Sequence, residues 1–185
     1  GLGTLFDRVT RVEWLSQLLM DLLGLSESVA QNTITAAKFC KNDLVSHMVG
    51  EFPELQGIMG GKYLLAEGKA REASLAILEH YLHRGSGDLL PKSEAGAALA
   101  IAERIEILLS IFAKGERPSG SSDPYALRRS ANGILQIIWA FDWKLDLKKL
   151  IDLSIKYWIQ VFPGLNIDSK TLFNDLTEFF RQRII

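Results

Sequence analysis

Residues 41–63, KNDLVSHMVGEFPELQGIMGGKY, carry the pattern that decides the fold. Apolar side chains recur at helical spacing on both sides of the break at Gly50–Pro53, so this stretch predicts two consecutive helices. Gly57, Gly60 and Gly61 lie on or near one turn of the second helix. Because a glycine inside a helix costs roughly 1 kcal/mol relative to alanine, we interpret this turn as a place where another helix backbone approaches closely.

Polar residues around the break complete this motif. We expect Asp43 to cap the first of the two helices, because its side chain can accept hydrogen bonds from free backbone N–H groups. The break itself carries Glu51, Glu54 and Gln56. We expect these three side chains to lie beside the glycine-lined helix crossing.

The remaining chain shows the same helical periodicity. Further helices are predicted over 4–23, from Ser26 or Ser28 to about Cys40, and over 69–83, 94–113, 125–141, 146–162 and 170–183. Helix caps are predicted at Thr4 with Asp7, at Ser93, at Asp123 followed by Pro124, at Asp146, and at Asp168 or Ser169. The long helix 94–113 has a predicted buried face of Ala97, Ala98, Ile101, Ile105, Leu108, Leu109 and Phe112. With no strand-like alternation, the sequence predicts an all-α, multi-helix bundle.

Length and composition fit a soluble chain of 185 residues with a net charge of −1. We predict a helical domain over 1–145 and a helical extension over 146–185. The single cysteine, Cys40, suits a reducing cytoplasm and is interpreted as a small buried side chain. No segment has the roughly 18 consecutive apolar residues of a membrane span. Because the chain begins at Gly1 without methionine, we expect a piece of a longer protein.

Two groups of residues are candidates for a metal site or a catalytic site. His80 and His83 are one helical turn apart and are weak candidates for a metal site; a helix end with exposed histidines is the simpler interpretation. Glu103 and Glu106 are also three residues apart, with Arg104 between them, which favours a solvated charged edge over a catalytic pair. No phosphate-binding glycine loop or nucleophilic triad is readable, so the sequence predicts no catalytic residue.

A basic, serine-rich segment is more informative. The candidate RNA-contact residues are Lys114, Arg117, Ser119, Ser121, Arg128 and Arg129. Cations and hydroxyl groups beside a helix N-terminus suit contact with phosphate. The alternative is a solvated loop whose arginines pair with Glu51, Glu54 or Glu116.

Two long motifs in order carry a resemblance to a known family. The first is KNDLVSHMVGEFPELQGIMG over 41–60, and the second is PSGSSDPYALRR over 118–129. Between them lie EHY at 79–81 and GDLLP at 87–91. Together these motifs resemble the β subunit of bacterial glycyl-tRNA synthetase of the two-subunit type.

This resemblance implies a module of a tRNA ligase. The family's α chain carries the core that makes glycyl-adenylate, so ATP and magnesium are expected there and no cofactor is expected in this segment. The β chain binds tRNA, so the implied partners are glycine tRNA and the α subunit, with no DNA and no membrane. The segment corresponds to a helical region related in fold to HD-domain phosphohydrolases. Its last helix leads towards an anticodon-binding region expected beyond Ile185.

The chain departs from an active phosphohydrolase of that fold. His47, His80 and His83 are followed by Met48, Tyr81 and Arg84, so the His-Asp dyad of HD enzymes is missing. Where the family usually has an Ala-Asp-Lys-x-Asp run, this chain has AERIE over 102–106, with both acids lengthened. We therefore expect a catalytically silent module that contacts the tRNA backbone and holds the β subunit in register. The alternatives are a metal-dependent HD phosphohydrolase and a pure scaffold that docks on the α subunit.

Overall fold

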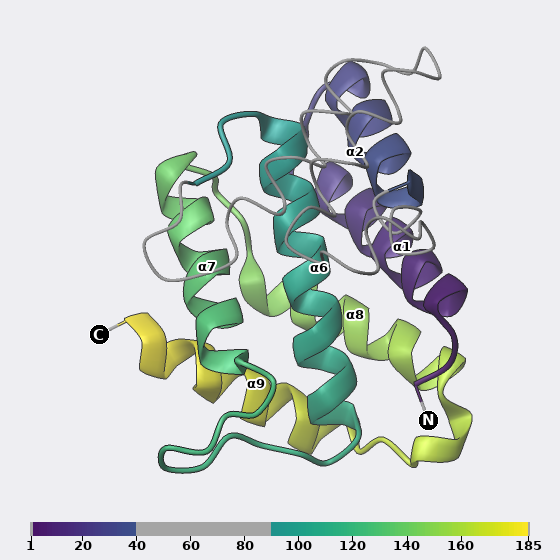
Figure 1. Cartoon of the computed structure of the whole chain (residues 1–185), viewed down its shortest axis with the longest axis vertical. Coiled ribbons are helices and arrows are strands. Elements are labelled where there is room, and N and C mark those ends of the chain that lie inside the picture. Colours follow the sequence, from purple (N-terminus) through teal and green to yellow (C-terminus); the bar gives the residue numbers. More distant parts are fainter. Residues whose placement is uncertain (1, 40–89, 185) are drawn as a thin grey trace, which may run out of the picture.

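The computed structural model describes residues 2–39 and 90–184 (Figure 1). In these two ranges the chain forms α1 (Leu5–Leu23), α2 (Glu27–Phe39), α6 (Glu94–Ala113), α7 (Leu127–Ala140), α8 (Leu147–Val161) and α9 (Ser169–Ile184), with a short 3-10 helix at Pro163–Leu165. No strand occurs in the described residues, where the all-α prediction is confirmed. Several predictions lie outside them: the motif residues Asp43, Glu51, Glu54, Gln56, Gly57 and Gly60, the cysteine Cys40 and the histidines His47, His80 and His83.

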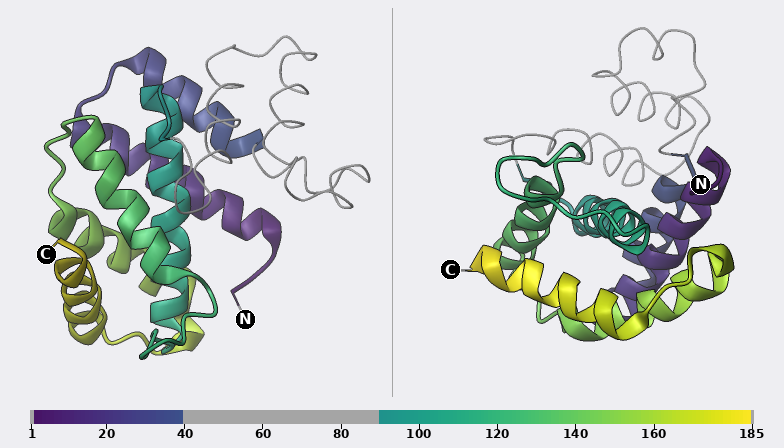
Figure 2. Two further views of the ribbon diagram at one scale, coloured as in Figure 1. Left: turned by 60° about the vertical axis from the view of Figure 1, so that its left-hand side comes forward. Right: turned by 90° about the horizontal axis from the view of Figure 1, so that it is seen from below.

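Helix α6 is the centre of the described structure (Figures 1 and 2). It packs against α1 and α2 on one side and against α7 on the other, and α8 and α9 cross it on a third side. Helix α7 returns antiparallel to α6 after the loop that joins them (Figure 1). The loop therefore lies at one end of the bundle, beside the middle of α9.

The sequence of α6 explains its central place. Its predicted buried face is confirmed, since Ala97, Ala98, Ile101, Ile105, Leu108, Leu109 and Phe112 are all at most 2% exposed. The alanines between these residues, Ala100 and Ala102, are also fully buried. Because alanine adds little width to a helix, neighbouring helices can approach α6 on several sides at once. A helix that is apolar around most of its surface is expected in the interior of a fold.

Local capping signals set most helix ends where the sequence places them. Thr4 and Asp7 form a reciprocal capping box at the start of α1, with N–H···O distances of 3.2 and 2.9 Å. Gly24 ends α1 in the left-handed conformation, with φ of 63°. Ser93 caps α6 and Asp146 caps α8 through side-chain oxygens. The predicted caps at Thr4 with Asp7, at Ser93 and at Asp146 are confirmed, because each signal acts within a single helical turn.

The start of α7 differs from the prediction. The helix begins at Leu127, so Pro124 and Tyr125 precede it and Pro124 is not at its first position. Asp123 still caps it, because its two carboxylate oxygens accept hydrogen bonds from the backbone N–H groups of Leu127 at 2.8 Å and Arg128 at 3.0 Å. The intervening Ala126 adopts a left-handed conformation with φ of 54°. This turn lets a cap reach a helix that starts four residues later.

Helices α8 and α9 contribute to the same hydrophobic core as α1, α6 and α7. Trp158 of α8 is fully buried, and its Nε1 donates a hydrogen bond to Ser110 Oγ of α6 at 3.2 Å. Phe179 of α9 packs edge-on against Phe112 of α6, with ring centroids 5.2 Å apart.

The division into 1–145 and 146–185 stays a prediction. None of the helices in the described ranges has the length and apolar character that crossing a membrane requires.

Candidate RNA-contact site

The candidate RNA-contact residues lie in the loop between α6 and α7 and in the first turn of α7. Ser119 and Ser122 hold the loop in a tight turn, because their backbones exchange N–H···O hydrogen bonds of 3.0 and 2.8 Å. Gly120 occupies the first central position of this turn with φ of 55°, a conformation that glycine adopts without strain. Ser119 and Ser121 are exposed at its tip. The turn thus presents two hydroxyl groups to solvent.

Arg117 attaches this loop to two helices. Its Nε and Nη2 donate to Asp175 Oδ2 of α9 at 3.2 and 3.0 Å. Its Nη1 donates to the backbone oxygens of Phe112 at 2.6 Å and Glu116 at 2.9 Å. The guanidinium also lies over the Phe112 ring, 4.4 Å from its centroid. All three guanidinium nitrogens are therefore engaged inside the molecule, which favours an anchoring role for Arg117; its RNA contact stays a prediction.

The other candidate cations differ in their exposure. Lys114 ends α6 and is exposed, and Arg129 in the first turn of α7 is exposed as well. Arg128 is half-buried. The proposed pairing of Arg128 or Arg129 with Glu51 or Glu54 falls on partners outside the described residues. The structure therefore brings Lys114, Arg128 and Arg129 to the two helix ends that the loop joins.

The N-terminus of α7 already holds an anion. A free helix N-terminus attracts phosphate through its unpaired N–H groups. Here the Asp123 carboxylate accepts from two of those groups, at Leu127 and Arg128. A phosphate contact at this loop would therefore come from side-chain cations rather than from the helix end itself.

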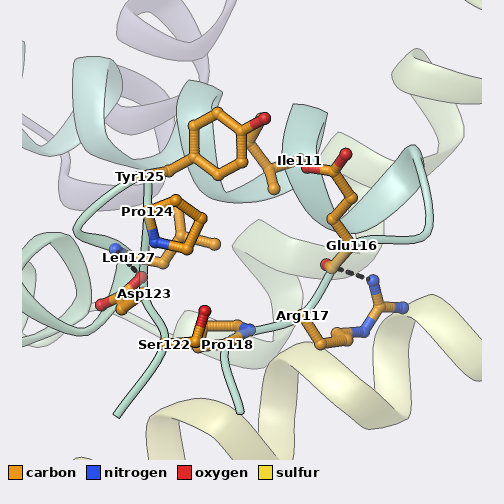
Figure 3. Close-up of a pocket in the computed structure, with 9 residues that line it drawn as sticks. All are labelled: Ile111, Glu116, Arg117, Pro118, Ser122, Asp123, Pro124, Tyr125 and Leu127. Atoms are coloured by element: carbon orange, nitrogen blue, oxygen red, sulfur yellow. Dashed lines mark hydrogen bonds between the residues drawn. The ribbon is translucent and has the colours of Figure 1, made fainter.

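A pocket of about 310 Å³ opens between the loop and α6 (Figure 3). Its lining combines apolar side chains and rings with polar groups: Ile111, Pro118, Pro124, Tyr125 and Leu127 on one hand, and Glu116, Arg117, Ser122 and Asp123 on the other. Tyr125 stands at one side of it with the ring 40% exposed. We call this cavity the Tyr125 pocket.

Glu116 and Tyr125 both line the mouth of the pocket. Polar interaction with the Glu116 carboxylate, followed by its negative charge, raises the pKa of Tyr125 above its usual value of 10.0. Figure 3 shows the Glu116 carboxylate on the same side of the pocket as the Tyr125 hydroxyl. The tyrosine is therefore a neutral phenol at physiological pH.

The prediction that Glu103 and Glu106 form a solvated charged edge is wrong. They are only 4% and 2% exposed, because α1 covers this part of α6. Arg11 Nε and Nη2 donate to Glu106 Oε2 at 3.1 and 3.0 Å, and Arg8 Nε lies 2.9 Å from Glu106 Oε1. Arg8 also pairs with Glu103 at 3.5 Å. The two carboxylates are thus neutralised by two arginines, and such a pairing suits a structural crosslink rather than a catalytic pair.

Within residues 2–39 and 90–184 no group of three or more His, Cys, Asp or Glu side chains is placed to hold a metal ion. The weak candidates His80 and His83 lie outside those ranges.

Sequence reasoning missed four residues of the buried charge cluster, the pocket and the loop anchor. Arg8 and Arg11 are three residues apart on α1, the same spacing as Glu103 and Glu106, and that match of opposite charges was the available signal. Tyr125 was readable as an aromatic residue that directly follows Pro124 at the end of a polar loop, which is typical of an exposed contact residue. Asp175 gave no signal, because nothing near it in the sequence points to Arg117.

Comparisons with known proteins settle the family. The sequence profile of the glycyl-tRNA synthetase beta subunit family matches residues 1–185. Among the relatives, the glycine–tRNA ligase beta subunit of Gloeothece citriformis is 42% identical over 183 residues, covering 99% of this chain and 25% of its own length. That of Clostridioides difficile is 44% identical, covering 99% of this chain and 26% of its own length. That of Streptococcus suis is 42% identical, with the same two coverages of 99% and 26%. The chain spans about a quarter of the length of these curated relatives, and it belongs to the glycyl-tRNA synthetase beta subunit family.

Proposed function

We propose that this chain is an internal helical module of the β subunit of glycine–tRNA ligase. In that role it supports the attachment of glycine to its tRNA by contacting the tRNA backbone and by holding parts of the subunit in register. The observation that carries the proposal is the family match over residues 1–185. It agrees with the arrangement of Lys114, Arg128 and Arg129 at the end of the bundle where α6 meets α7.

The partners and cofactors of the whole enzyme follow from this proposal. Glycine tRNA and the α subunit are the proposed partners, in the cytoplasm. ATP and magnesium act at the α subunit, where glycyl-adenylate forms, and no cofactor is assigned to this module.

Charge and geometry support contact with phosphate rather than with base edges for the three cations. Lysine and arginine neutralise phosphates, and such contacts fix the position of the RNA without reading its sequence. The loop between them is rigid, because Arg117 attaches it to α6 and α9. The exposed hydroxyls of Ser119 and Ser121 add further donors to the same surface.

A second candidate function is a scaffold that docks on the α subunit and makes no RNA contact. One observation favours it: all guanidinium nitrogens of Arg117 bond within the chain, so the loop motif has a structural use of its own. The phosphohydrolase alternative has less support. It needs acids from α6 as metal ligands, and Glu106 already accepts from Arg11 and Ser110.

The test is tRNA binding by the complete α/β enzyme across a salt series. The variant Lys114→Ala/Arg128→Ala is compared with wild type and with Lys148→Ala, which removes an exposed cation of α8. Each lost phosphate contact is expected to lower the slope of log affinity against log salt by about 1, with little change in the control. Unchanged affinity and slope in a folded double variant would exclude contact through this loop and favour the scaffold.

A further inference from the structure

We propose that the Tyr125 pocket binds one unpaired nucleobase of the RNA, stacked on the Tyr125 ring and hydrogen-bonded through an amino group to Glu116. This inference rests on the proposed function, because the RNA must first reach the loop between α6 and α7. It adds a base-binding site to a surface for which we have argued only phosphate contact.

The shape of the pocket suits a flat ring. Its volume of about 310 Å³ lies at the lower end of the range for small-ligand sites. Ile111 and Leu127, which are 5% and 1% exposed, form its apolar floor. Tyr125 and the two proline rings stand around that floor (Figure 3). The apolar side chains and rings of this pocket can contact the faces of a bound base, and its polar groups can contact the base edge.

Tyr125 is placed to stack. Tyr125 is 40% exposed and lines the pocket, so its side chain is accessible to a ligand. Proteins recognise single-stranded RNA by stacking splayed bases on such aromatic rings.

The hydrogen-bonding groups of the pocket select for donors on the ligand. Asp123 uses both oxygens on the backbone of α7. Arg117 is engaged with Asp175 and with backbone oxygens. Glu116 and the Ser122 hydroxyl remain, and the Glu116 carboxylate offers about four acceptor positions. Adenine, cytosine and guanine carry an exocyclic amino group that can donate to it, whereas uracil does not.

The surroundings favour RNA over a peptide as the occupant. Lys114 and Arg128 flank in sequence the segment that forms the pocket, and we expect them to contact the phosphates on either side of a bound base. An uncharged peptide segment would offer these two cations no anion. The rigid attachment of the loop by Arg117 means that little ordering is needed on binding.

The experiment uses the complete α/β enzyme with Tyr125→Leu, Tyr125→Phe and wild type. Leucine keeps an apolar side chain but removes stacking, and we expect tRNA binding to weaken about fivefold to a hundredfold with an unchanged salt slope. Phenylalanine keeps the ring, so its affinity stays within about threefold of wild type. Ultraviolet cross-linking of bound tRNA is expected to attach an unpaired nucleotide to the peptide that contains Tyr125. Free nucleotides serve as isolated probes: CMP is expected to reduce the cross-linking of tRNA to this peptide more strongly than UMP does.

The outcomes separate this inference from the function on which it rests. If Tyr125→Leu binds tRNA like wild type while Lys114→Ala/Arg128→Ala weakens binding, the base site is overturned and backbone contact stands. If neither variant changes binding, both proposals fail. If Tyr125→Leu instead prevents assembly with the α subunit and leaves tRNA binding intact, the pocket holds a peptide and the nucleobase proposal is wrong. Thermal unfolding of each variant confirms that the exposed substitutions leave the fold intact.

Discussion

Arg117 and Asp175 lie 58 residues apart in the sequence, and two guanidinium nitrogens of Arg117 donate to one carboxylate oxygen of Asp175 at 3.2 and 3.0 Å. This pair joins the loop after α6 to the middle of α9. Both side chains are partly exposed, at 31% and 45%. The pair therefore contributes little to global stability, about 0.2–1 kcal/mol. What it does fix is the position of the loop that carries the candidate RNA-contact residues.

The first prediction separates anchoring from direct contact at Arg117. Asp175→Asn keeps Arg117 and removes its charged partner on α9. If Arg117 acts by holding the loop, Asp175→Asn weakens tRNA binding by the complete enzyme and Arg117→Ala, which also removes the hydrogen bonds to the Phe112 and Glu116 oxygens, weakens it at least as much, with the salt slope of both staying that of wild type. A loss confined to Arg117→Ala, with a lower salt slope, would instead show that its guanidinium touches phosphate.

The buried pair Arg11 and Glu106 gives the second prediction. Glu106→Leu leaves the buried Arg11 without its carboxylate partner and should destabilise the fold by about 3–5 kcal/mol, whereas Arg11→Met should cost less because Glu106 keeps its ion pair with Arg8. The double variant Arg11→Met/Glu106→Leu replaces the pair with apolar groups, and we expect its loss to be much smaller. Urea denaturation of wild type, the two single variants and the double variant gives the four free energies of unfolding of a double-mutant cycle. Additive losses in the double variant would contradict a coupled pair.

The strained backbone at Ala126 gives the third prediction. A non-glycine residue at φ of 54° pays a steric cost of roughly 1 kcal/mol or more. Ala126→Gly removes that cost but makes the unfolded chain more flexible, so the net effect should lie between about 0 and 1 kcal/mol of stabilisation. Ala131→Gly, in the buried interior of α7, is the matched control and should destabilise by about 1 kcal/mol. Equal losses in both variants would mean that Ala126 is not strained.

Trp158 gives the fourth prediction, which tests the division into 1–145 and 146–185. Because Trp158 is fully buried against α6, Trp158→Ala should cost about 3–5 kcal/mol. If both parts share one cooperative core, thermal unfolding of the variant remains a single transition at a lower temperature. Two separate transitions, with only the first displaced, would support two independently folding units.

The cap of α9 gives the fifth prediction, a dependence on pH. The backbone N–H of Thr171, followed by its hydroxyl, donates to Asp168 and lowers the pKa of that carboxyl below its ordinary value of 3.8. Because the pKa of Asp168 is lower in the folded state, its carboxylate stabilises the folded protein fully at a pH above the ordinary pKa. This stabilisation is lost as the pH falls through the lower folded-state pKa. The melting temperature of Asp168→Ala should therefore lie below that of wild type at neutral pH and approach it in acid.

Asp168→Asn is the control for that titration. Asparagine caps helices about as well as aspartate but carries no proton in this range. Its melting temperature should stay close to that of wild type at neutral pH and show none of the acid-dependent loss that comes from Asp168. A difference between Asp168→Ala and wild type that persists unchanged in acid would contradict the titration of this cap.

The sequence by itself determined the helices of the described ranges and the ends of α1, α6 and α8. Those features depend on apolar periodicity and on caps such as Thr4, Ser93 and Asp146, which act within one helical turn. The family was also readable from the sequence, because two long motifs occur in the right order and the family match covers the whole chain.

Only the tertiary structure decided the surroundings of the charged side chains. Glu106 looked like a surface residue until α1, 95 residues away in sequence, placed Arg11 against it. Arg117 looked like a free cation until α9 brought Asp175 to it. A local pattern records which residues share a helix face but not which distant helix covers that face. The burial and pairing of charges are therefore set by packing, and with them the choice between a structural role and a contact with RNA.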